Sequence, residues 1–274
     1  MDDAFERWLQ ALQKRHLERL TLPEIRRALQ ALSSLYVERR GKIASGAALD
    51  GAGKRAAFAL FYAPLHFLLV REIVRALGAA DPPPRRILDL GCGTGTSSAA
   101  WAQQRGQASF RAPGENPEKE SDAVSSHIVG FDVSGWALDE ARWNWSLLGV
   151  GGRAERADLA RAPMPKAGEA VLAAFTLNEL DEALRERIRT RLLEAGRKGA
   201  TVLVVEPLSR RSAPWWDGWA EEFLRAGGRA DAWRFPVALP EPLRQLDKAA
   251  GLDHSLLTGR TIYLRGGLGA QCGA

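Results

Sequence analysis

The sequence predicts an α/β fold in which a doubly wound, mostly parallel sheet follows an N-terminal helical segment. Three observations support this. Short, continuous apolar runs alternate with helical stretches after residue 85, whereas apolar residues recur at helical spacing before residue 80. Between these parts, Asp81-Pro-Pro-Pro84 cannot be helical and prefers an extended conformation. Apolar strands between helices are typical of a parallel sheet covered on both faces. We therefore expect a helical cap or lid over residues 1–80 and a sheet domain over residues 85–274.

The composition excludes several classes of protein. The chain has 274 residues, of which 46% are hydrophobic and 26% are charged, so it is neither disordered nor fibrous. Two cysteines, Cys92 and Cys272, are too few for a disulfide framework or a four-thiolate metal site, and we expect no metal. The start of the sequence has no apolar leader, and the apolar window Ala56–Val70 is shorter than the roughly 20 residues of a membrane span. We expect a cytoplasmic protein with no membrane partner.

Two amphipathic helices are expected first. The earlier one has a stripe formed by Phe5, Leu9, Leu12 and His16. The later one follows a capping box, Thr21-Leu-Pro-Glu24, and directs Ile25, Leu29, Leu32 and Leu35 toward a core.

A third helix is expected at 54–77, after a small-residue loop at 41–53. Pro64 should kink or split this helix, because proline lacks a donor and its ring clashes with the preceding turn. Gly78 suits the position just after the helix.

Strands and helices alternate in the second part of the chain. We expect strands at 87–90, 127–132, 170–176, 201–205 and 262–264, and helices at 96–104, 136–148 and 182–195. The polar stretch 106–126 has no periodicity, so we expect an inserted, mobile loop.

The most informative segment is the glycine-rich turn after the first of these strands. Arg86-Ile-Leu-Asp-Leu-Gly91-Cys-Gly93-Thr-Gly95-Thr96 ends a strand and begins a helix, where free amides and small residues allow a ligand to approach the backbone. A dinucleotide-binding loop is the alternative, but its third glycine would fall at position 96, where this chain has Thr96.

ILDLGCGTG resembles motif I of class I S-adenosylmethionine-dependent methyltransferases, and the resemblance covers about residues 85–210. It implies a seven-stranded Rossmann-like sheet with strand order 3-2-1-4-5-7-6 and an antiparallel last strand. It also implies S-adenosyl-L-methionine as the cofactor. The cofactor-binding positions that the resemblance implies are Asp89, Gly91, Cys92, Gly93, Gly95, Asp132, Val133, Asp158, Leu159 and Thr176.

Asp132 ends the next strand, where open sheets bind ligands, and its carboxylate can accept from both hydroxyls of a ribose. It lies 37 residues after Gly95, rather than the usual distance of about 20, and the insertion accounts for the excess. The alternative is that Asp132 caps the following helix, for which Ser134 is the better candidate.

Two further segments resemble family motifs. Asp158 resembles the acid that contacts the adenine amino group, although an aspartate in a loop is often only a turn residue. Asn178-Glu-Leu-Asp181 corresponds to motif IV, but it lacks the prolines and aromatic residue of enzymes that methylate adenine N6. The candidate catalytic residues are Asn178, Glu179 and, at the end of a later strand, Glu206.

A narrower resemblance is to the methyltransferase-like factors of mitochondrial small-ribosomal-subunit assembly and their bacterial relatives. It rests on TLNEL, the arginine-rich helix after it, and VLVVEP. Those proteins carry a cysteine cluster, which is missing from the stretch 234–243 here, so neither a metal centre nor ribosome binding carries over.

Other residues have both a functional and a structural interpretation. His66 is expected in the helical core and His254 in a loop, although both are possible bases. Trp215, Trp216 and Trp219 either form the wall of an aromatic acceptor site or pack an amphipathic helix on the sheet, and we favour packing.

The charge distribution bears on the acceptor. The net charge of +5 lies entirely within residues 1–80, where Lys42, Lys54 and Arg55 flank a flexible loop beside aromatic residues. Such an arrangement suits single-stranded RNA, but it also fits a solvated helix. We therefore expect a methyltransferase acting on a small molecule or on RNA. A non-catalytic cofactor-binding assembly protein is the alternative, and Thr96 disfavours a nicotinamide-dependent oxidoreductase.

Overall fold

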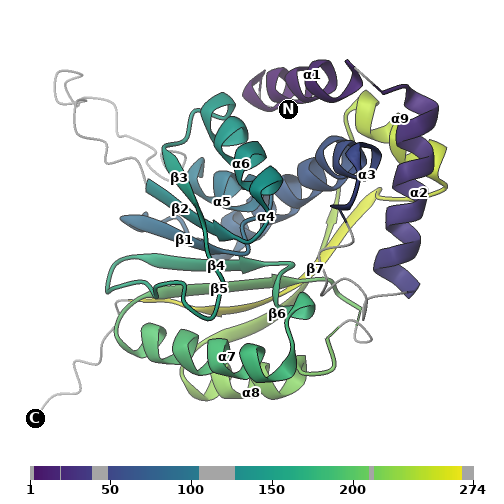
Figure 1. Ribbon diagram of the computed structural model, residues 1–274. Helices are drawn as coiled ribbons and strands as arrows, with labels where there is room; N and C mark the ends of the chain where they lie inside the picture. Colours follow the sequence, from purple (N-terminus) through teal and green to yellow (C-terminus); the bar gives the residue numbers. More distant parts are fainter. Residues whose placement is uncertain (1–2, 19, 39–48, 105–126, 210–212, 267–274) are drawn as a thin grey trace, which may run out of the picture.

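The computed structural model describes residues 3–18, 20–38, 49–104, 127–209 and 213–266 (Figure 1). Within these residues, seven strands form one sheet in the order β3-β2-β1-β4-β5-β7-β6. β7 runs antiparallel to both β5 and β6, and the other pairs are parallel. The predicted fold class and strand order are therefore confirmed. The strands are β1 Arg86–Leu90, β2 His127–Asp132, β3 Gly152–Arg156, β4 Ala170–Ala174, β5 Thr201–Glu206, β6 Arg229–Pro236 and β7 Leu256–Leu264.

Helices cover both faces of the sheet. One face packs against α4, α5 and α6, and the other against α7 and α8 (Figure 1). Neighbouring residues of a strand point to opposite faces, so Ile87 joins the first cluster and Leu88 the second. The helices are α4 Ala63–Leu77, α5 Thr96–Ala102, α6 Gly135–Leu147, α7 Glu182–Arg197 and α8 Trp216–Arg225. Trp216 and Trp219 are buried in the second cluster, which supports the packing interpretation of this tryptophan-rich helix.

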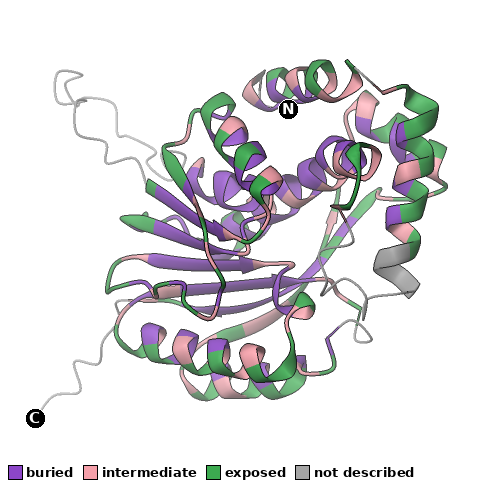
Figure 2. Ribbon diagram, viewed as in Figure 1, coloured by how far each residue is buried: buried purple, intermediate pink, exposed green. Residues whose placement is uncertain are grey.

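The N-terminal helices share their core with the sheet. α1 (Asp3–Leu17), α2 (Leu22–Glu38) and α9 (Glu241–Ala250) lie outside α4, beyond one end of the sheet (Figure 1). Phe5, Leu12 and Ile25 are buried in the same hydrophobic cluster as strand residues of the first face. The N-terminal helices carry both buried and exposed residues (Figure 2). The N-terminal segment therefore packs as part of one continuous core and has no separate core of its own.

The helix containing Pro64 is not split. α3 (Ala52–Ala57) continues through a π-helical turn, Phe58–Tyr62, directly into α4. In this turn the Ala63 amide bonds to the Phe58 carbonyl, and the wider spacing accommodates the proline ring without breaking the helix. The expected break is thus replaced by a π turn, and the expected kink stays a prediction. The resulting 26-residue helix Ala52–Leu77 is, among the described residues, long and apolar enough to cross a membrane, but 72% of its most apolar window is buried inside the protein.

The structure adds two strands that the sequence did not predict. β3 and β6 are the two edge strands of the sheet; β3 has one buried residue, Ala154, and β6 has none. Because an edge strand faces water, it lacks the continuous apolar run that identified the central strands. β7 also begins at Leu256, earlier than expected. The expected mobile insertion at 106–126 and most of the loop at 41–53 lie outside the described residues.

Candidate functional site

A cavity of about 550 Å³ lies at the carboxyl ends of β1, β2 and β4. One part of its wall is the glycine loop after β1 together with the turn after β2. The opposite part comes from the long helix Ala52–Leu77 and from the segment that joins α9 to β7. The cavity therefore lies between the sheet and the N-terminal helices, where open α/β sheets bind their ligands.

The glycine loop has three residues with positive φ, and they differ in what surrounds them. Gly91, Gly93 and Gly95 have φ angles of 67°, 49° and 73°. A Cβ on Gly91 would lie 2.3 Å from Thr176 Cγ2, and one on Gly95 would lie 2.5 Å from Trp145 Nε1. A Cβ on Gly93 would meet no atom within 4 Å. Gly91 and Gly95 are thus required by packing, whereas Gly93 leaves open space beside the cavity.

Two side chains of α6 hold the carbonyls of this loop. The Asn144 amide donates to the Thr94 carbonyl over 2.9 Å, and the Trp145 indole donates to the Gly95 carbonyl over 2.8 Å. Both side chains are almost fully buried. Neither contact is predictable from the sequence, because nothing local to α6 indicates a partner 50 residues away.

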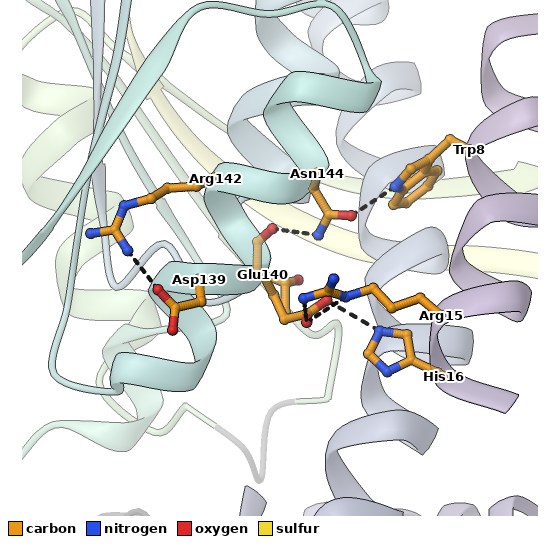
Figure 3. A network of polar contacts seen from close by, with 8 residues as sticks. Trp8, Arg15, His16, Asp139, Glu140, Arg142 and Asn144 are labelled. Carbon is orange, nitrogen blue, oxygen red and sulfur yellow. Dashed lines mark hydrogen bonds and ion pairs between the residues drawn. The ribbon is translucent and has the colours of Figure 1, made fainter. Parts of the chain in front are cut away.

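The network continues from Asn144 to the N-terminal helix (Figure 3). The Trp8 indole donates to Asn144 Oδ1 over 2.7 Å. On the same face of α6, the buried Glu140 accepts from the Arg15 guanidinium and contacts His16 Nε2. Burial acts to raise the pKa of Glu140, but the hydrogen bonds from His16 and Arg15 outweigh it and leave the pKa lowered. α1 is thus tied through α6 to the backbone of the glycine loop.

Asp132 joins the two turns at this edge of the sheet. Its Oδ2 accepts from the Gly93 amide over 2.9 Å, and its Oδ1 accepts from the Ser134 amide over 2.8 Å. A carboxylate can accept about four hydrogen bonds, so two acceptor positions remain for a ligand. Ser134 caps α6 by accepting from the Ala137 amide, as expected.

Asp89 lies beneath the loop and is not part of the cavity wall. Its side chain is 1% exposed, and its Oδ2 has no hydrogen-bond partner among the described residues. Burial raises the pKa of Asp89 to about 7, with a smaller contribution from the charge of Asp132 and an opposing hydrogen bond from Ser98. Asp89 Oδ2 is therefore either an unpaired hydrogen-bond acceptor or a protonated oxygen, directly behind the glycine loop.

Two of the three candidate catalytic residues are already engaged with the protein. Glu206 is fully buried and accepts from the Leu177 amide over 2.9 Å and from Asn178 Nδ2 over 2.5 Å. Asn178 Oδ1 in turn accepts from the Trp215 indole over 3.0 Å. Burial raises the pKa of Glu206 to about 8 despite the two hydrogen bonds. These contacts fix the positions of Asn178 and Glu206 in the cavity wall, and a catalytic role for either stays a prediction.

Glu179 is the third candidate, and it lines the cavity as an exposed residue. Its carboxylate has no hydrogen-bond partner in the described part of the chain, and it reaches solvent through the cavity. Enclosure by the cavity wall, followed by the charge of Asp132, raises the pKa of Glu179 to about 7. A carboxyl group with such a pKa can exchange protons near neutral pH.

Aromatic rings form the wall opposite the glycine loop. The His66 ring stacks on Phe175 with centroids 3.9 Å apart and an interplanar angle of 18°. Phe175 has a φ of 59°, a conformation that costs about 1–3 kcal/mol for a residue other than glycine. Burial, followed by the charge of His254, lowers the pKa of His66 to about 3, so this ring is neutral at pH 7. His66 was expected in the core, but it lines the cavity.

His254 also lines the cavity, and it is paired with an acid of α9. Its ring nitrogen Nδ1 lies 2.6 Å from Asp247 Oδ1, and its backbone amide donates to Asp247 Oδ2 over 2.9 Å. Asp247 is buried, and the His254 ring also contacts Phe61 edge to face. The expectation of a simple loop residue is therefore incomplete, because the acid that orients this histidine lies on a helix that the sequence did not predict.

The described cavity wall contains carboxyl groups but no strongly basic side chain. None of the described residues that line the cavity is a lysine or an arginine, whereas Asp132, Glu179 and Glu206 all line it. Lys54 and Arg55 do not line it, and Arg55 instead donates to the Leu49 carbonyl. Lys42 lies outside the described residues.

Most of the cofactor positions implied by the family resemblance come together in this cavity. Those that line it are Gly91, Cys92, Gly93, Asp132, Val133 and Thr176. Asp158 and Leu159 do not line it: the Asp158 carboxylate accepts from the Ala160 amide, and Leu159 is buried on the other face of the sheet. Gly95 lies behind the loop against Trp145. No group of three or more potential metal ligands occurs in the described ranges.

Comparisons with known proteins find similar folds. No protein-family model and no curated protein matches the sequence. The methyltransferase domain of bacterial CtHen1 is 16% identical, with a TM-score of 0.46 over 73% of this chain and 99% of that chain. The magnesium protoporphyrin IX methyltransferase ChlM from Synechocystis PCC 6803, solved with bound SAM, is 14% identical, with a TM-score of 0.42 over 73% of this chain and 80% of that chain. The pyocyanin biosynthetic protein PhzM is 20% identical, with a TM-score of 0.46 over 85% of this chain and 61% of that chain.

Proposed function

We propose that this protein is an S-adenosylmethionine-dependent methyltransferase that acts on an acceptor held between the sheet and the N-terminal helices. The observation that carries the proposal is the open space at Gly93. This glycine has positive φ, lines the cavity and is linked by its amide to Asp132 at the end of the next strand. A loop of this kind lets the backbone approach a nucleoside with an amino-acid tail.

The residues present fit this cofactor. The two remaining acceptor positions on Asp132 suit the hydroxyls of a ribose, and the unpartnered Oδ2 of Asp89 lies behind the loop that would hold the amino-acid tail. A pyrophosphate would need the free backbone amides of this loop, but the Gly93 amide already donates to Asp132, whose carboxylate would also repel phosphate. A nicotinamide dinucleotide therefore fits less well than a sulfonium nucleoside.

The cofactor would supply a methyl group on a positively charged sulfur. The protein would mainly have to bind this group, hold the acceptor in line with it and exclude water. The Asp132 carboxylate in the cavity wall favours a positive charge, and Glu179, with a pKa of about 7, can accept a proton there.

The test is calorimetric titration of S-adenosylmethionine and S-adenosylhomocysteine into wild type, Gly93→Val and Asp132→Ala. We expect Gly93→Val to abolish binding, because the side chain would fill the space beside the loop. We expect Asp132→Ala to weaken binding by about 1.5–3 kcal/mol, as for lost hydrogen bonds to a charged group.

Gly149→Val is the matched control for the glycine substitution. Gly149 also has positive φ and no atom within 4 Å of its Cβ, but it does not line the cavity. The control should therefore share the backbone strain and keep the affinity. If Gly93→Val binds as tightly as this control, the glycine loop is a structural turn only. Binding without transfer to any acceptor pool would instead support a non-catalytic protein.

A further inference from the structure

The aromatic part of the cavity has a composition that restricts the acceptor. Phe58, Tyr62, His66 and Phe175 provide rings, and Leu65 and Leu257 provide apolar surface. His66 is neutral at pH 7, since burial lowers its pKa to about 3. Burial likewise raises the pKa of Tyr62, so its hydroxyl stays protonated. An anionic acceptor would find no described cation in this wall, whereas an uncharged planar molecule would find rings of matching shape.

The same part of the cavity contains a histidine with a defined tautomer. A carboxylate only accepts hydrogen bonds, so the His254 proton lies on Nδ1, which faces Asp247 Oδ1. This leaves Nε2 as the nitrogen that can take a proton, and it has no hydrogen-bond partner among the described residues. Asp247 is held in turn by the backbone amide of His254. A buried acid that orients a histidine is the arrangement that proteins use to make a general base.

We propose that His254, oriented by Asp247, is the general base for methylation of an uncharged aromatic hydroxyl compound that binds against the His66–Phe175 pair. The inference rests on the proposed methyltransferase function. The acceptor oxygen would lose its proton to His254 Nε2 and form the new O–CH3 bond. The S–CH3 bond breaks, its electron pair stays on sulfur, and the products are the methyl ether and S-adenosylhomocysteine. The proton then passes from His254 to water.

Several titratable groups from other elements surround His254. Asp247 on α9 accepts its proton and stabilises the imidazolium that forms. His66 on α4 is close enough to feel its charge, and Asp253 on the same loop has its pKa lowered by Ser255 and, less strongly, by His254. Tyr62, on the π turn, is near Asp247 and remains neutral.

The experiment uses three ligands that share one ring: 1-naphthol, 1-naphthylamine and 1-naphthyl phosphate. We expect 1-naphthol to bind the cofactor-free protein and to shift the ring NMR signals of His254 but not those of His127, which is exposed at the start of β2. We expect the phosphate ester to bind at least about tenfold more weakly, because its charge has no described partner in the wall. Methyl transfer from labelled cofactor should occur to 1-naphthol and not to the phosphate ester.

The base is tested with His254→Gln, with His127→Gln as the matched control. At pH 7 we expect His254→Gln to lower kcat about 100-fold without changing cofactor affinity, since a general base contributes about 10²–10⁴-fold. The rate of this variant should rise with pH toward wild type, because hydroxide can then take the proton of the bound 1-naphthol in place of the histidine. Asp247→Asn tests the positioning residue and should produce a smaller loss with the same pH signature.

Several results would overturn the proposal. In the binding assay, they are no binding of 1-naphthol, or equal binding of 1-naphthol and its phosphate ester. In the transfer assay, they are methyl transfer to total RNA or to 1-naphthylamine in place of 1-naphthol. In the kinetic assay, it is a kcat of His254→Gln within about threefold of wild type at pH 7. A 100-fold loss in Glu179→Gln with none in His254→Gln would assign the base to Glu179. Thermal denaturation verifies that the variants fold. Failure to bind S-adenosylmethionine at all would instead contradict the proposed function, so the two failures are distinguishable.

Discussion

The hydrogen bond between Trp8 and Asn144 links the N-terminal helix to the glycine loop, and Trp8→Phe should break it. Both side chains are 1% exposed, so the variant leaves the Asn144 carbonyl oxygen buried and unpaired. An unpaired buried group costs about 1–3 kcal/mol. The missing ring atoms of the indole add roughly 1 kcal/mol. We therefore expect a loss of roughly 2–4 kcal/mol in the free energy of unfolding, measured by urea denaturation.

The effect of these substitutions on cofactor binding depends on the hydrogen bond from Asn144 to the glycine loop. Trp8→Phe leaves the bond from Asn144 to the Thr94 carbonyl, whereas Asn144→Leu removes both. We expect Asn144→Leu to weaken the binding of S-adenosylhomocysteine more than Trp8→Phe does. The double variant should be at least about 1 kcal/mol more stable than the sum of the single effects predicts, because it leaves no unpaired Asn144 oxygen.

Trp101→Phe is the matched control for this prediction. The Trp101 indole is also fully buried, but it donates to the Ala79 carbonyl and not to the network of Asn144. It should cost comparable stability and leave cofactor affinity unchanged. The reasoning is refuted if the free energy of unfolding of Trp8→Phe lies within about 0.5 kcal/mol of the wild-type value, which is the usual effect of an isolated surface substitution. It is also refuted if the two single effects simply add.

Three further predictions concern the loop, its buried acid and RNA. Asp89 binds its proton more tightly in the folded state, where its pKa is about 7, than in the unfolded state, where it is 3.8. The free energy of unfolding of wild type relative to Asp89→Asn should therefore fall as pH rises from about 4 to 7, by up to about 1.4 kcal/mol per pH unit. A difference between the two proteins in urea denaturation that stays constant with pH would contradict this. Gly91→Ala should lower the melting temperature more than Gly149→Ala, because only the former places a Cβ against Thr176. Equal shifts in melting temperature would show that the loop moves to accommodate the added Cβ. The affinity for total RNA should depend only weakly on salt concentration. A plot of log affinity against log salt concentration with a slope steeper than about −2, equivalent to three phosphate contacts, would instead support RNA as the acceptor.

The sequence by itself determined the features that are local or periodic. The turn from Gly91 to Gly95 was recognisable because positive φ and close approach restrict these positions to glycine. The buried strands were recognisable as continuous apolar runs, and Asp132 by its place at a strand end. The strand order came from the family resemblance, and the structure has the same order.

Tertiary structure decided which polar groups have partners. Asn178 and Glu206 look like catalytic residues in the sequence, but the fold pairs them with each other and with Trp215. His254 looks like an ordinary loop residue until α9 places Asp247 beside it.

Long-range contacts also decided how the two parts of the chain join. Trp8 and Asn144 are 136 residues apart, and neither has a local signal that names the other. The edge strands β3 and β6 were missed because one side of each faces water, which removes the apolar run that a buried strand shows. Backbone conformation and burial leave local patterns in a sequence, whereas a hydrogen bond between distant residues depends on the packing of the whole core.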